Sequence, residues 1–156
     1  MNMRAFTLIE LILVIGILGI LSGIGFNVYY NFYANVKVDE EANKIVEVLR
    51  GTRQKAINGE NLSAWGVRFA YPTSSDSYYD VFEGTSYSSG TSTDKYYLPN
   101  GVSFVNPSAS STIDAVFNVR SGGVSTSSNI SITVRSIIAS STKNITITPK
   151  GLISRD

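Results

Sequence analysis

A single carboxylate interrupts an otherwise apolar stretch near the start of the chain. Residues 6–21 read FTLIELILVIGILGIL, and Glu10 carries the one charged side chain among them. A carboxylate at the centre of a membrane helix costs about 2.5–3.5 kcal/mol, so such a residue normally has a partner or a function that offsets the cost. We therefore expect a positively charged group to meet Glu10.

Four further carboxylates fall in one region of the chain, where a carboxylate pair or an oxygen-rich calcium site could form: Asp76, Asp80, Glu83 and Asp94. They lie in or beside Ser-rich segments and lack the spacing of a calcium-binding loop, which favours solvated loop charges. The chain has no Cys and no His, so thiolate nucleophiles, imidazole bases and the usual zinc ligands are excluded. The sequence predicts no enzyme, no metal and no cofactor.

The apolar stretch is long enough to cross a bilayer. It continues to Phe26, which gives about 31 Å of helix at about 1.5 Å per residue. Arg4 precedes it and four aromatic residues, at 29, 30, 32 and 33, follow it like an interfacial belt. We expect a transmembrane segment at 6–33, with the N-terminus in the cytoplasm. A cleaved secretory signal and a buried core helix are the alternatives.

The pattern becomes amphipathic after residue 33. Apolar residues recur at three- and four-residue steps, as expected for a helix over 34–58 that buries one face: Ala42, Ile45, Val46, Leu49 and Ala56. Asn58-Gly59 is typical of a helix C-terminus. One continuous helix from about Thr7 to Ile57 would therefore serve both the membrane segment and a globular domain at 34–156.

Residues 63–156 change to a period of two, which indicates half-buried strands. The expected strands lie near 65–70, 78–83, 101–105, 112–119, 130–135, 144–148 and 152–155, and the Ser/Thr-rich segments 72–77, 85–94 and 106–111 are expected as loops. The sequence predicts an α+β fold, in which a long N-terminal helix packs on one antiparallel β-sheet.

The segment Ala5-Phe6-Thr7-Leu8-Ile9-Glu10-Leu11, with its short basic leader MNMRA, resembles the processing motif of type IV prepilins and type II secretion pseudopilins. The resemblance implies that a prepilin peptidase removes residues 1–5, cuts between Ala5 and Phe6, and methylates the Phe6 amine. Glu10 would then be the fifth residue of the mature chain, where this family keeps a glutamate. Ala5 departs from the family, which almost always has Gly before the cut.

The resemblance also supplies the partner that Glu10 lacks. The new Phe6 amine of a neighbouring subunit can pair with Glu10 as helices slide past each other during assembly. The implied partners are other pilin or pseudopilin subunits, the peptidase and methylase, the inner-membrane assembly platform and membrane lipid. The protein would reside in the bacterial inner membrane as a single-pass protein before it joins a pilus or pseudopilus.

The remaining segments WGV, YYDVFE, LPNGVSF, VFNVRSGGVS, ISITV and ITITPKGLIS resemble the H-type minor pseudopilin and FimT-like branch. This resemblance implies a minor structural subunit, with DNA binding through C-terminal basic residues as the alternative. The candidate residues are Arg120, Arg135, Lys143, Lys150 and Arg155. No aromatic residue is interleaved with them to stack bases, and the formal net charge of the whole chain is only +1, so DNA is the less favoured partner.

Overall fold

The computed structural model describes residues 6–156, apart from the side chains of residues 24–28. The chain divides into two compact units, Met1–Tyr33 and Ala34–Asp156. The predicted leader, residues 1–5, lies outside the described residues.

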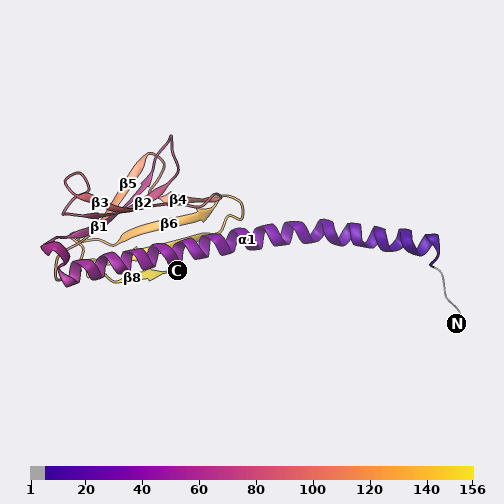
Figure 1. The fold of residues 1–156 in the computed structure, drawn as a ribbon, viewed down its shortest axis with the longest axis horizontal. Helices are drawn as coiled ribbons and strands as arrows, with labels where there is room; N and C mark the ends of the chain where they lie inside the picture. Colours follow the sequence, from indigo (N-terminus) through magenta and orange to yellow (C-terminus); the bar gives the residue numbers. More distant parts are fainter. Residues whose placement is uncertain (1–5) are drawn as a thin grey trace. The chain divides into compact units, whose positions relative to one another are not determined.

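One helix, α1 (Leu8–Asn58), supplies residues to both units (Figure 1). At its start the Thr7 side-chain oxygen accepts a hydrogen bond of 3.4 Å from the Glu10 backbone N–H, which satisfies one of the free donors of the first turn. At its end Gly59 takes a left-handed conformation with φ 68°, as the Asn-Gly pair predicts. The continuous helix expected from about Thr7 to Ile57 is confirmed.

The second unit holds a short 3-10 helix, η1 (Glu60–Leu62), and eight strands. The strands are β1 (Trp65–Tyr71), β2 (Tyr78–Glu83), β3 (Thr91–Tyr97), β4 (Val102–Asn106), β5 (Ser111–Phe117), β6 (Ile130–Ser136), β7 (Thr142–Ile147) and β8 (Ile153–Arg155). They form two four-stranded sheets with orders β3-β2-β1-β5 and β4-β6-β7-β8, and every pairing within them is antiparallel.

The α+β class with a long helix on antiparallel strands is confirmed, but the expectation of one sheet is wrong. The chain leaves the first sheet after β3, passes through Pro99 and Gly101, and starts the second sheet with β4. Gly101 has φ +92°, a conformation that side-chain-bearing residues rarely adopt. β5 then returns to the first sheet and pairs with β1. The alternating pattern within a strand does not determine which strand it pairs with, so the second sheet could not be predicted from the sequence.

The core of the second unit joins both sheets to α1. The apolar residues predicted to face the domain, at positions 42, 45, 46, 49 and 56, are all buried. They share one cluster with Trp65, Phe69 and Tyr79 of the first sheet and Phe104 and Ile132 of the second. Figure 1 shows both sheets along the part of α1 that belongs to this unit.

Strand β3 corrects a second expectation, since residues 85–94 were predicted as a loop and β3 begins at Thr91. Its side chains are almost all exposed, so the strand has no buried apolar face that would produce an alternating pattern. It is an edge strand held by pairing with β2, and the register shifts at Val81/Phe82.

Candidate functional site

The first turn of α1 presents the residues of the processing motif. Phe6 is 76% exposed and Glu10 is also exposed, while Ala5 lies outside the described residues. Thr7 and Glu10 have the spacing of a capping box, in which a Glu three residues into the helix complements a Thr cap. This role of Thr7 was not predicted from the sequence, although the Thr-x-x-Glu pattern is its usual signal.

The described residues 6–23 are all exposed, and most are large and apolar. Within the described part of the chain, no helix combines the length and hydropathy needed to cross a membrane. Residues 24–28 of the predicted span lie outside the described side chains, and the segment 6–33 stays a prediction.

Two of the five C-terminal basic residues meet an acidic residue of α1. Arg155 lies 2.8 Å from the Asp39 carboxylate and also donates to the Asp39 backbone oxygen, while Lys143 lies 3.4 Å from the same carboxylate. Burial acts to raise the pKa of Asp39, but the hydrogen bonds and charges of Lys143 and Arg155 outweigh it and lower that pKa. These two cations therefore hold β7 and β8 to the helix.

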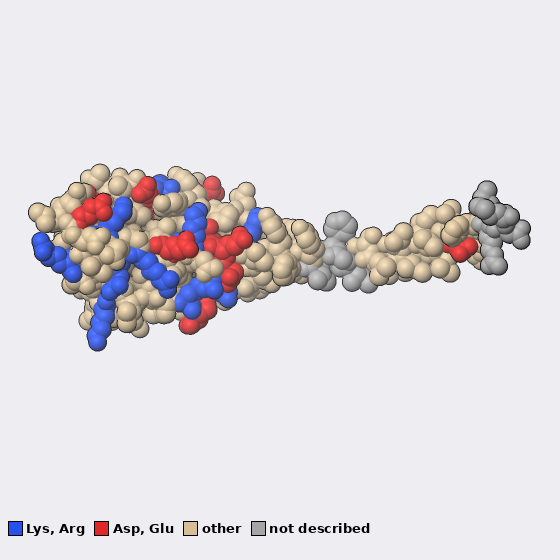
Figure 2. Space-filling model, turned by 60° about the horizontal axis from the view of Figure 1, so that its bottom comes forward, with Lys and Arg blue, Asp and Glu red and all other residues tan. Residues whose placement is uncertain are grey.

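The other three basic residues lie elsewhere. The Arg135 guanidinium donates a 3.4 Å hydrogen bond to the Ser103 hydroxyl, and its side chain lies on an exposed position of β6. Arg120 and Lys150 are exposed in turns near the C-terminal end of α1, where the Arg120 backbone N–H donates to Ala56. The structure thus does not gather the five predicted residues into one surface, and Figure 2 shows Lys and Arg interspersed with Asp and Glu.

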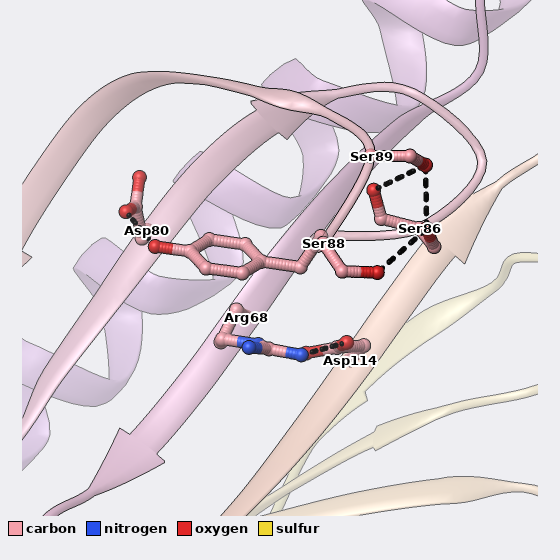
Figure 3. Close-up of polar contacts among 7 residues, drawn as sticks. Arg68, Asp80, Ser86, Ser88, Ser89 and Asp114 are labelled. Carbon is pink, nitrogen blue, oxygen red and sulfur yellow. Dashed lines mark hydrogen bonds and ion pairs between the residues drawn. The ribbon is translucent and has the colours of Figure 1, made fainter.

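A polar cluster covers the outward face of the first sheet (Figure 3). Arg68 on β1 forms two hydrogen bonds of 2.6 Å with Asp114 on the neighbouring β5, a bidentate pair. The hydrogen bond from Arg68 to Asp114 raises the pKa of the guanidinium. The Tyr87 ring lies 4.0 Å from the guanidinium, and its hydroxyl donates to Asp80 at 2.8 Å.

The loop that carries Tyr87 explains one of the suspected carboxylates. Asp80 accepts hydrogen bonds from Tyr87 and Ser92 and is only 1% exposed, so its carboxylate holds the loop instead of facing a substrate. The hydrogen bond to Asp80 raises the pKa of Tyr87 to about 12. Sequence reasoning missed Arg68, Tyr87 and Asp114, which are brought together only by strand pairing and a long loop.

A second buried carboxylate lies inside the domain. Glu41 on α1 is 6% exposed and accepts a 3.0 Å hydrogen bond from the hydroxyl of Tyr79, which is fully buried. Burial raises the pKa of Glu41, although the Tyr79 hydrogen bond and the Lys44 charge oppose the shift. Burial and the neighbouring Glu41 raise the pKa of Tyr79 as well. This pair links the helix to β2.

The remaining candidate carboxylates do not lie together in one site. Glu83 accepts a hydrogen bond from Asn61, and Asp94 lies on the exposed edge strand. Asp76 lies at the rim of a separate small pocket. Among the described residues, no group of His, Cys, Asp and Glu side chains could hold a metal ion.

The comparison with protein families bears on the N-terminus. The family described as the prokaryotic N-terminal methylation motif matches residues 1–26. The match indicates a type IV pilin-like precursor. The motif points to processing by a prepilin peptidase and to assembly with other pilins after membrane anchoring. No curated protein and no solved structure matches the chain.

Proposed function

We propose that the chain is a minor pilin or pseudopilin, a non-enzymatic subunit of a type IV pilus or a type II secretion pseudopilus. The observation that carries the proposal is the methylation-motif match over residues 1–26, which ends inside a helix that continues to Asn58. The H-type branch is proposed on the resemblance of the sequence segments between residues 65 and 154. A peptidase cuts after Ala5, Phe6 is methylated, and the mature subunit enters the fibre through its N-terminal helix.

The apolar run 6–26 anchors the precursor in the inner membrane in this proposal. Its support is the sequence itself, with twenty-one residues that contain one charge, a basic leader before them and an aromatic belt after them. Exposure of every described side chain from residue 6 to residue 23 agrees with a segment that finds its apolar surroundings in lipid or in neighbouring helices.

Glu10 has two candidate roles that can be separated. As an ion-pair partner it meets the Phe6 amine of a neighbouring subunit, and as a capping-box residue it stabilises the first turn of its own helix. Glu10→Gln retains the capping shape and loses the charge, whereas Glu10→Val loses both. Thr7→Ala removes the cap and leaves the charge, so it is the matched control.

Processing is tested by intact-mass measurement of the protein from membranes. We expect an N-terminus at Phe6 that carries one methyl group, and a formal side-chain charge that falls from +1 to 0 because Arg4 leaves with the leader. A mature chain that begins after Gly25 would instead establish a secretory signal and refute the proposal.

Assembly is tested by co-purification of tagged variants with other pilin subunits, with membrane fractionation as the control. If charge pairing dominates, both Glu10→Gln and Glu10→Val lower incorporation, with Val lower, while Thr7→Ala stays near wild type. Insertion of the Val variant is unchanged or improved, because a costly charge is removed. Normal incorporation of Glu10→Val would refute the assembly role and leave peptidase or methylase recognition as the function of Glu10.

A further inference from the structure

A small pocket opens at one end of the second unit, between segments that are far apart in the sequence. It is lined by the segment after β1, the connection from β3 to β4 and the residue that follows β6, and its volume is about 200 Å³. Pockets for drug-sized ligands run from about 300 to 1,000 Å³, so this one suits a single ring. The processing motif and the DNA alternative make no use of it.

Backbone hydrogen bonds fix the segments of this pocket. The Leu98 N–H donates to the Ser77 oxygen and the Ile137 N–H donates to the Gly101 oxygen, both at 2.9 Å. The Val102 N–H closes the turn by donating to Pro99 at 3.1 Å. The pocket is therefore formed before any ligand arrives, which reduces the ordering cost of binding.

Four polar side chains of the pocket make no hydrogen bond to the described part of the protein, whereas Ser103, which also lines the pocket, accepts one from Arg135. Among the described residues, none donates to or accepts from the side chains of Tyr71, Ser75, Asp76 or Asn100. The outward face of the first sheet is different, because Arg68 there is fully engaged by Asp114 and Tyr87. Ser75, Asp76 and Asn100 are exposed, so water satisfies them in the free protein, and a ligand in the pocket can replace that water with hydrogen bonds of its own.

The chemistry of the lining selects among ligands. No Lys or Arg lines the pocket and Asp76 is its one carboxylate, so a phosphate or a carboxylate ligand would be repelled. One carboxylate is also too few for a calcium ion, which takes six to eight oxygen ligands. A purely apolar ligand would leave the unpaired groups without water or partner.

We propose that this pocket binds one neutral pyranose ring of a carbohydrate. The Asp76 carboxylate accepts from sugar hydroxyls, and the Asn100 amide both donates and accepts, which matches adjacent hydroxyl groups. Ile137 and the carbon skeleton of Tyr71 offer an apolar surface to the C–H face of the ring, and the Tyr71 hydroxyl adds a further polar contact. A Kd on the order of 1 mM is expected for so small a site.

The experiment is saturation-transfer NMR on the full chain in micelles of a sugar-free detergent, because glycoside detergents would compete. The probes are the methyl glycosides of glucose, galactose and mannose, each at about ten times the expected Kd, with glucuronic acid as the charged counterpart. We expect transfer to at least one neutral glycoside and at least tenfold weaker binding of the acid.

Variants locate the site. Asp76→Ala and Asn100→Ala should each weaken binding about tenfold or more, since each removes hydrogen bonds to the sugar. Asp94→Ala removes an exposed carboxylate outside the pocket and is the matched control, with wild-type binding expected. Unfolding followed by Trp65 fluorescence shows whether each variant keeps its fold. No transfer to any neutral glycoside, or equal transfer in all three variants, would overturn the proposal.

Discussion

The hydrogen bond between Tyr79 and Glu41 gives the sharpest test of how the helix is held to the first sheet. Tyr79→Phe removes only the hydroxyl and leaves a buried carboxylate without its donor. A hydrogen bond to a charged group contributes about 1.5–3 kcal/mol, so we expect the free energy of unfolding to fall by about 2 kcal/mol. With a urea m-value of about 2 kcal/mol per molar, the midpoint should fall by about 1 M.

The assay is urea unfolding of the full chain in micelles, followed by fluorescence. Trp65 is the one tryptophan and is 2% exposed in the core, so its emission reports unfolding of the second unit. In a Glu41→Gln background the same Tyr79→Phe change breaks a hydrogen bond between neutral groups and should cost only about 0.5–1.5 kcal/mol. Equal costs in the two backgrounds would refute the reasoning.

The pH dependence has a definite sign. Burial raises the folded-state pKa of Glu41 above its ordinary value of 4.5, so the native state binds the proton more tightly than the unfolded state. Relative to Glu41→Gln, the stability of the wild type is greatest below pH 4.5 and is lost as the pH rises through the folded pKa. A difference that instead grows with pH over this window would contradict the raised pKa.

Three further outcomes follow from other contacts. Gly66→Ala should lower the free energy of unfolding by about 1–3 kcal/mol in the urea assay, because its Cβ would overlap a phenylalanine ring on β2. Tyr87→Phe should flatten the fall in stability between pH 10 and about 12, since the hydrogen bond to Asp80 raises the pKa of Tyr87 and favours its neutral form. The DNA alternative predicts binding to duplex DNA with a log-log salt slope of about −2 to −3 that Arg120→Gln and Lys150→Gln both weaken, and no binding at low salt would remove it.

The helix and most of the strands could be predicted because periodicity reports burial directly. The stripe at Ala42, Ile45 and Leu49 has the three- and four-residue steps of one helix face, and all three residues are buried in the structure. Strand β3 could not be found in this way, because Tyr96 is its one partly buried side chain and a single position makes no alternating pattern. The division of the strands into two sheets could not be predicted either, because the alternation of residues within a strand does not determine which strand it pairs with.

The polar contacts depend on tertiary pairing. Arg68 and Asp114 are 46 residues apart and meet only because β5 returns beside β1. Glu41 is a charged residue beside the apolar positions of the helix, and nothing in the sequence marks it as buried, yet it is 6% exposed and accepts a hydrogen bond from Tyr79. In contrast, the N-terminal motif is a contiguous run of residues, so the sequence alone was sufficient to identify it.

The contact between Asp39 and Arg155 has a consequence for the order of synthesis and folding. The two residues are separated by 116 positions, and β8 pairs only with β7, so the second sheet is completed when residues 153–155 have emerged. Until then β7 is an uncovered edge and Asp39 lacks its closer cation, Arg155. Because the ribosome makes the chain from its N-terminus, the residues of the first unit emerge well before the second unit can close. The N-terminal part of α1 therefore has time to reach its destination before the second unit has folded.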